Sequence, residues 1–187
     1  MIPVSSTKIT RAGCARWEGV EPNDSLGGVN GVVERYDREV RLAAASDPDA
    51  AFARSIERLL RYVIFPPSIM QPIICSEDGL LHEGTTIVQR VAIGPLRIEP
   101  AVRVLRVWRA GDADTEEAGF TYATLPGHPE RGISSFWVTH HKTSGRIYFA
   151  IEARSQPGSL VYRLGGPVAR RFQRRATLAA LDYFARM

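Results

Sequence analysis

Residues 124–132, with the sequence TLPGHPERG, combine ionisable side chains with a rigid backbone. His128 is the side chain best able to exchange a proton near neutral pH, and Glu130 could orient it. Arg131 could stabilise negative charge that develops beside them. These three residues are therefore the candidate catalytic group, and they suit acid–base chemistry on a small organic substrate.

The same segment also predicts a stiff turn. Pro126 suits the second position of a type II turn, and Gly127 supplies the positive φ that the third position requires. His128 precedes a proline and is therefore pushed to extended geometry. Glu130 and Arg131 could equally pair with each other and pin the loop to a sheet. We therefore favour a structural role for the segment over a catalytic one.

Other polar groups lack the spacing of a metal site. His140 and His141 are neighbours, so on a strand their side chains would point to opposite faces. The acidic run GDADTEE at residues 111–117 lacks the ligand spacing of a calcium loop. Cys14 and Cys75 are too few for a disulfide scaffold and have no metal-ligand spacing. We expect neither a metal nor a cofactor.

Hydrophobic periodicity predicts the elements that position these residues. A helix is expected from Asp47, which can cap it, to the proline pair at residues 66–67. A long amphipathic helix is expected from the glycine pair at residues 165–166 to the C-terminus. Alternation of apolar and polar residues predicts strands at residues 32–42, 85–93, 101–109, 118–125, 134–141 and 146–153.

This order of elements predicts an α+β fold. A run of strands without intervening helices excludes a doubly wound parallel sheet and favours a curved antiparallel sheet of about six strands. The long C-terminal helix would cover its apolar face. Because 187 residues are close to one domain length, we expect a single domain at residues 31–187 after an irregular lead-in at residues 1–30.

Two runs, GFTYATLPGHPERG and RLGGPVARRFQRRAT, resemble the signature of an uncharacterised bacterial and plant family, a domain of unknown function. The pattern of that family is GFxYGTLPGHPERGEExF, followed by a helix that starts with LGGPVAR. The chain has Ala123 where the family has glycine, Ile133 and Ser134 where it has two glutamates, and Gln156 where it has arginine. The resemblance implies membership, and it implies no particular reaction.

The order of strands and helices also resembles the START-like helix-grip fold, in which a curved sheet wraps a long C-terminal helix. That resemblance implies an apolar cavity between sheet and helix that accepts hydrophobic ligands. Tyr122, His128 and Arg131 would supply polar groups near its mouth. The candidate ligand-binding residues are Phe120, Tyr122, Phe136, Val138, Phe149, Ile151 and Phe172.

Three functions follow. The first is a binding module for a small hydrophobic or amphipathic molecule, and the second is an enzyme that uses His128, Glu130 and Arg131. The third is a basic surface on the last helix, because residues 163–187 contain six arginines and one acid. Such a surface could bind anionic membranes or nucleic acid. Nucleic acid is the least favoured partner, since the strands lack a pattern of stacking and basic residues.

The remaining expectations concern location. The N-terminal residues lack the apolar stretch of a signal peptide, and the most apolar later segment, residues 62–75, is interrupted by three prolines. We therefore expect no transmembrane segment. Only two cysteines, far apart in the sequence, fit a reducing compartment, so a cytoplasmic protein is expected.

Overall fold

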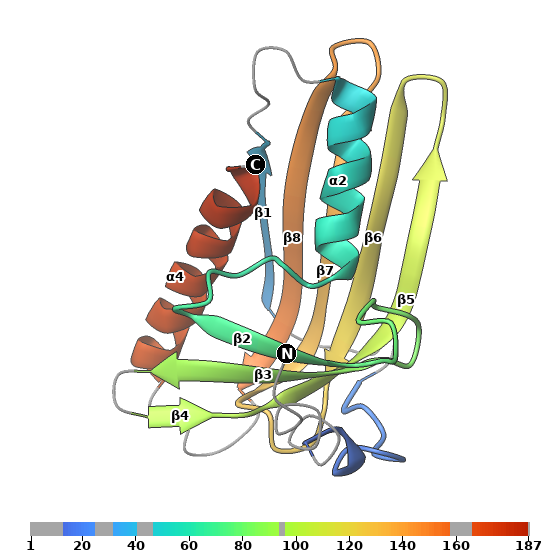
Figure 1. Cartoon of the computed structure of the whole chain (residues 1–187). Coiled ribbons are helices and arrows are strands. Elements are labelled where there is room, and N and C mark those ends of the chain that lie inside the picture. Colours follow the sequence, from blue (N-terminus) through green and yellow to red (C-terminus); the bar gives the residue numbers. More distant parts are fainter. Residues whose placement is uncertain (1–12, 25–31, 41–46, 94–95, 158–165, 187) are drawn as a thin grey trace, which may run out of the picture.

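The computed structural model of the protein describes residues 13–24, 32–40, 47–93, 96–157 and 166–186 (Figure 1). Its main feature is one antiparallel sheet of eight strands, in the order β1-β8-β7-β6-β5-β3-β2, with β4 paired to β3. Two long helices accompany the sheet. The elements are β1 (Val32–Glu39), α2 (Pro48–Leu60), β2 (Met70–Cys75), β3 (Thr86–Ile93), β4 (Leu96–Ile98), β5 (Ala101–Gly111), β6 (Thr115–Thr124), β7 (Glu130–His141), β8 (Arg146–Pro157) and α4 (Gly166–Ala185).

The predicted α+β class and helix-grip arrangement are confirmed, and all six predicted strands are present. Two further strands, β2 and β4, were not predicted. Pro72 lies within β2 and breaks the strand pattern in the sequence. A proline is tolerated there because β2 is the last strand in the sheet order and needs no hydrogen bonds on its outer side. β4 has only three residues, too few for a period to be read.

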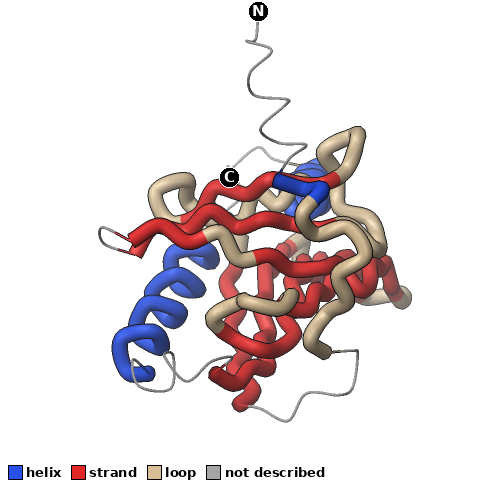
Figure 2. Tube along the Cα trace, turned by 90° about the horizontal axis from the view of Figure 1, so that it is seen from below, coloured by secondary structure: helices blue, strands red, loops and turns tan. Residues whose placement is uncertain are grey.

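The sheet bends sharply at β5. The start of β5 pairs with β3, and most of its length pairs with β6. The register with β6 shifts between Val104 and Arg106, which marks a bulge, and bulges increase the local bend and twist of a strand. As a result β2, β3 and β4 run across the lower ends of the long strands in Figure 1. Seen from below, α4 lies on the open side of this bent sheet (Figure 2).

Both helices lie on the concave face. The α2 helix contacts β6, β7 and β8, and α4 contacts β8 and β1. As predicted, Asp47 caps α2: its carboxylate accepts hydrogen bonds from the backbone N–H groups of Asp49 and Ala50. The large core cluster combines inward side chains of the strands with Phe52 and Leu59 of α2 and Leu181 and Phe184 of α4.

The C-terminal end of α4 is held by neighbouring elements. The Arg58 guanidinium of α2 donates hydrogen bonds to the backbone oxygens of Phe184, at 3.2 Å, and Tyr183, at 3.4 Å. A cation in this position also interacts favourably with the negative end of the helix dipole. Arg38 of β1 forms an ion pair with Asp182. These contacts fix α4 against both α2 and the edge of the sheet.

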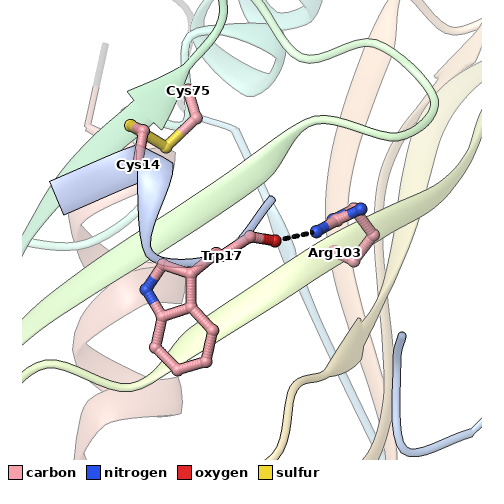
Figure 3. Close-up of a disulfide and its surroundings, with 4 residues drawn as sticks. All are labelled: Cys14, Trp17, Cys75 and Arg103. Atoms are coloured by element: carbon pink, nitrogen blue, oxygen red, sulfur yellow. Dashed lines mark hydrogen bonds between the residues drawn. A yellow bond between two sulfur atoms is a disulfide. The ribbon is translucent and has the colours of Figure 1, made fainter. Parts of the chain in front are cut away.

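The described part of the lead-in, residues 13–24, packs on β3 and the start of β5, on the face of the sheet that points away from the two helices. Trp17 forms a second, smaller core cluster with Val88, Ala101 and Leu125. Arg103 of β5 donates a hydrogen bond of 2.8 Å to the backbone oxygen of Trp17 (Figure 3). The described part of the lead-in is thus anchored to the sheet.

Cys14 and Cys75 form a disulfide bond, a pairing that was not expected of two distant cysteines in a reducing compartment (Figure 3). The bond joins the lead-in to the end of β2 across 61 residues, a proximity that the sequence did not reveal. Because disulfides persist in oxidising compartments, the cysteines no longer support the predicted reducing, cytoplasmic location.

Candidate functional site

A cavity of about 150 Å³ lies between the concave face of the sheet and α4. One part of its lining is apolar and includes Phe65, Met70, Val91, Ile98, Phe136 and Ile151. The other part is polar and consists of Gln89, Tyr122, His128, Glu130, Ser134, Gln173 and Thr177. The lining therefore combines an apolar set of side chains, here called the apolar wall, with a hydrogen-bonding set, here called the polar end.

The predicted ligand-binding residues divide into two groups. Tyr122, Phe136 and Ile151 line the cavity. The others for which the structure describes a side chain, Phe120, Val138 and Phe149, do not line it and are fully buried in the core cluster. Phe120 stacks on its cross-strand partner Phe136 with ring centroids 5.2 Å apart, so it supports a wall residue from the neighbouring strand. The side chain of Phe172 lies outside the described residues.

The turn predicted in TLPGHPERG is confirmed. The backbone N–H of His128 donates to the backbone oxygen of Leu125 at 3.1 Å, and Gly127 has φ 85°. The turn is shorter than the motif, however, because β7 begins at Glu130. Glu130 and Arg131 are therefore neighbouring strand residues that point to opposite faces of the sheet.

His128 lines the cavity, and its ring is fixed from both sides. Nδ1 lies 2.9 Å from the backbone oxygen and 3.0 Å from the backbone nitrogen of Glu130, and Nε2 lies 3.4 Å from Oε1 of Gln89. Burial lowers the pKa of His128 to about 4, so the imidazole is neutral at pH 7. It is the backbone of Glu130, rather than its carboxylate, that holds the ring.

Glu130 is the ionisable group of the cavity that titrates near neutral pH. Burial, and in second place the negative charge of Glu34, raise its pKa to about 7, while a hydrogen bond with Ser155 acts in the opposite direction. Gln173 of α4 donates a hydrogen bond from Nε2 to Oε2 of Glu130 at 3.0 Å. A carboxyl group with a pKa near 7 can release or accept a proton at neutral pH.

Arg131 does not join His128 and Glu130 at the cavity. Its guanidinium lies on the other side of the sheet, with Nε 3.2 Å from Oδ1 of Asp24. Nη2 also donates to the backbone oxygen of Asn23 at 2.8 Å. Arg131 thus fastens the lead-in to β7, and it does not pair with Glu130.

Sequence reasoning missed Tyr62, which lies behind the cavity. Tyr62 follows α2 with φ 53°, a left-handed conformation that glycine usually adopts at this position. Its N–H bonds the Leu59 oxygen, and the Val63 N–H bonds the Arg58 oxygen, which together form a Schellman motif. The conformation places the ring in the core, at 1 % exposure, beside Phe65, Phe120 and Phe136.

Gln89 connects Tyr62 to the cavity. It is 3 % exposed, and its Nε2 donates to the Tyr62 hydroxyl at 2.8 Å while its Oε1 faces His128. The sequence held a signal for this residue, because Gln89 shares the otherwise apolar face of its strand with Ile87 and Val91. A buried amide on such a face requires hydrogen-bonding partners.

Tyr122 completes the polar end. Burial, the largest effect, and the charge of Glu130 raise the pKa of its hydroxyl above the ordinary value, although hydrogen bonds with Ser134, Gln89 and Tyr62 act in the opposite direction. Ser134, one of the departures from the family pattern, therefore lies in the cavity. Tyr62, Gln89, Tyr122 and Ser134 form a neutral network beside the ionisable Glu130, so the cavity can orient a polar group and exchange a proton with it.

The two histidines at the end of β7 face opposite sides, as the sequence predicted. His140 is 2 % exposed, packs on Phe52 with centroids 5.3 Å apart, and has its Nδ1 3.6 Å from a carboxylate oxygen of Asp49. His141 is exposed and meets the edge of Tyr148. Among the described residues, no group of three or more His, Cys, Asp or Glu side chains could hold a metal ion.

Of the basic cluster on α4, Arg171, Arg174 and Arg175 are exposed, and the side chain of Arg170 is outside the described residues. Within the described part of the chain, no helix has both the length and the hydropathy needed to cross a membrane.

Comparison with known proteins gives a family match over most of the chain. The family described as "Domain of unknown function (DUF1990)" matches residues 30–182. No curated protein is significantly similar in sequence.

Several solved structures are similar at low identity. A hypothetical protein from Helicobacter pylori is 11% identical with a TM-score of 0.49, over 92% of this chain and 94% of that one. Norcoclaurine synthase from Thalictrum flavum, in complex with dopamine and hydroxybenzaldehyde, is 12% identical with a TM-score of 0.45, over 84% and 86%. The major latex-like protein 151 from Panax ginseng is 11% identical with a TM-score of 0.45, over 83% and 97%.

Proposed function

This chain belongs to the DUF1990 family of domains of unknown function, so its activity has to be argued from its own site, and we propose that the cavity binds a small amphipathic molecule. The observation that carries this proposal is the division of the lining into an apolar wall and a hydrogen-bonding end. Ligand sites commonly combine apolar walls with a few placed polar groups.

The size of the cavity limits the ligand. Pockets for drug-sized molecules measure roughly 300–1,000 Å³, whereas this one measures about 150 Å³. An apolar cavity of about 150 Å³ is large enough to hold benzene. The ligand is therefore about the size of a single ring with a short polar substituent.

The polar end limits its orientation. Gln89 and Tyr122 are held by hydrogen bonds within the protein, so little side-chain entropy is lost when they bind a ligand. The apolar body would lie against Phe65 and Phe136, and the substituent would face Glu130.

Native mass spectrometry of the protein purified from its own host, before and after denaturation, tests this proposal. We expect a co-purifying small molecule of about the mass of a substituted ring. Ala176 lines the cavity, and a Phe side chain there would fill it, so Ala176→Phe should lose the molecule. Ala179→Phe is the matched control on α4, outside the lining, and should retain it. Retention of the molecule by a folded Ala176→Phe protein would reject the cavity as its site.

Acid–base catalysis on the bound molecule is a second candidate function, supported by the pKa of about 7 at Glu130. Incubation of the co-purified molecule with the protein, followed by NMR, should then reveal a product. Glu130→Gln should abolish the conversion, because an amide cannot exchange the proton. Conversion at the wild-type rate by Glu130→Gln would eliminate this version of the enzyme.

A further inference from the structure

We infer that the ligand of this cavity is a cation: a protonated amine on a ring-sized apolar body, with its ammonium group against the Glu130 carboxylate. The inference rests on the proposed function and adds the charge of the ligand to it. It comes from the charges that surround the cavity and from the kind of side chains in its wall.

The described lining of the cavity contains one carboxyl group and no positively charged side chain. Glu130 is the one carboxyl group of the described lining, which contains no Lys or Arg side chain. His128 is the other ionisable nitrogen there, and burial keeps it neutral. A partly buried carboxylate is stabilised in its ionised form by a positive partner or by hydrogen bonds. Gln173 supplies one hydrogen bond at 3.0 Å, and it supplies no charge.

A second carboxylate adds to the negative charge. Glu34 of β1 lies in one cross-strand row with Ala153, Ser134 and Tyr122 on the concave face. Ala153 and Ser134 are small, so nothing bulky in this row separates Glu34 from Tyr122. Glu34 acts on Glu130 through its charge, which is one cause of the raised pKa of Glu130. Neither acid belongs to an ion pair between described residues.

Among the side chains that the structure describes, the charged groups of the surrounding elements do not neutralise this pair. Arg131 of β7 faces the other side of the sheet, where it binds Asp24. Arg154 of β8 and Arg174 of α4 are exposed. The remaining neighbours of Glu130 among the described side chains are His128 on the turn, Gln173 on α4, Ser155 on β8 and Tyr122 on β6, and all of them are neutral at pH 7.

The apolar wall also suits a cation. Phe65, Tyr122 and Phe136 present aromatic rings to the cavity. The faces of such rings attract ammonium groups, and the attraction is strongest where water is excluded. An anionic ligand would instead meet two carboxylates and no cation, so the same cavity disfavours it.

Binding of a cation and ionisation of Glu130 must then support each other. A cation beside Glu130 favours its charged form, so the amine should bind more tightly as the pH rises through the pKa of about 7. A neutral molecule of the same shape lacks this coupling, and its affinity should stay constant over the same range.

Calorimetric titration of the full chain with three probes of one shape tests the inference: benzylamine, benzyl alcohol and benzoate. We expect benzylamine to bind about tenfold more tightly than benzyl alcohol at pH 8, in line with a charge-assisted hydrogen bond. Benzoate should bind most weakly. The affinity for benzylamine should rise between about pH 6 and pH 8, whereas the affinity for benzyl alcohol should not.

Variants assign the effect to Glu130. Glu130→Gln should reduce the affinity for benzylamine to that for benzyl alcohol, and Glu34→Gln should cause a smaller reduction. Glu152→Gln is the control, because Glu152 lies on the opposite face of β8 among Arg35, Trp108 and Trp137, and it should change nothing. Benzyl alcohol or benzoate binding as tightly as benzylamine would overturn the cationic ligand and leave the proposed cavity intact. Binding of none of the three probes would reject the ring-sized cavity itself.

Discussion

The Gln173 amide of α4 donates a hydrogen bond to the Glu130 carboxylate of β7, with Nε2 and Oε2 3.0 Å apart. This contact joins the C-terminal helix to the sheet at the cavity. Because Glu130 is also the group that titrates near pH 7, the position of α4 and the charge in the cavity are linked.

Gln173→Leu should raise the pKa of Glu130 above its value of about 7. The amide donates to the charged carboxylate, and loss of such a donor favours the neutral acid. The measurement is the pH dependence of the side-chain carboxyl signal of Glu130 in carbon-detected NMR. Gln71→Leu, at an exposed position of β2, should leave that signal unchanged. A Glu130 pKa equal to or below the wild-type value in Gln173→Leu would contradict the prediction.

His128 and Glu130 should act against each other in the pH dependence of stability. The folded-state pKa of His128, about 4, lies below its ordinary value, so its contribution is present above pH 6.5 and is lost as the pH falls towards 4. The folded-state pKa of Glu130, about 7, lies above its ordinary value, so its contribution is present below pH 4.5 and is lost as the pH rises towards 7. Each contribution amounts to about 3 kcal/mol, and the two have opposite signs, so they offset each other.

Single substitutions should uncover each contribution. In Glu130→Gln, the free energy of unfolding should rise by up to about 3 kcal/mol between pH 4 and pH 6.5. In His128→Gln, it should fall by a similar amount between pH 4.5 and pH 7. Urea denaturation across this range measures both slopes. If the free energy of unfolding depended on pH in the variants as it does in the wild-type protein, His128 and Glu130 would not have the shifted pKa values on which the prediction rests.

Tyr62→Phe should lower the free energy of unfolding by about 1–3 kcal/mol. The substitution retains the ring and removes the hydroxyl that accepts from Gln89 Nε2, which leaves a buried donor without its partner. The double variant Tyr62→Phe/Gln89→Leu should be more stable than the sum of the two single changes predicts, because it removes both partners. Urea denaturation of the wild-type protein, the two single variants and the double variant completes the double-mutant cycle. If the two changes in the free energy of unfolding simply added, the contact between Tyr62 and Gln89 would be contradicted.

Cys14→Ser/Cys75→Ser should lower the free energy of unfolding by about 4 kcal/mol, the loop-closure effect for a bond that spans 61 residues. Denaturation with and without dithiothreitol provides the measurement. The reductant should destabilise the wild-type protein and leave the double variant unchanged. Equal stability of the oxidised wild-type protein and the double variant would show that the bond contributes nothing.

Local pattern was enough to predict most of the fold. The cap at Asp47, the turn around Gly127 and the inward alternation of β6, β7 and β8 are all properties of short segments, and the structure contains each of them. β2 could not be predicted in this way, because Pro72 is acceptable only on an edge strand, and edge position is a property of the whole sheet.

The site was less accessible to prediction, because its contacts join distant segments. Gln89 and His128 are 39 residues apart, and Glu130 and Gln173 are 43 apart. Neighbouring residues of a strand face opposite sides, which separates Glu130 from Arg131. This rule could not be applied from the sequence, because the start of β7 at Glu130 was not predicted. The pKa of about 7 at Glu130 depends on burial and on Glu34, which belongs to another strand.

The disulfide between Cys14 and Cys75 closes a covalent ring that contains both end strands of the sheet order, β1 and β2, with α2 between them. Exposed edge strands are the usual route by which two copies of a chain exchange segments. With the bond intact, neither β1 nor β2 can be exchanged with a second molecule as an open segment, because each belongs to a closed loop. The bond therefore constrains domain swapping at both edges of the sheet, and reduction of this one bond would remove the constraint from both at once.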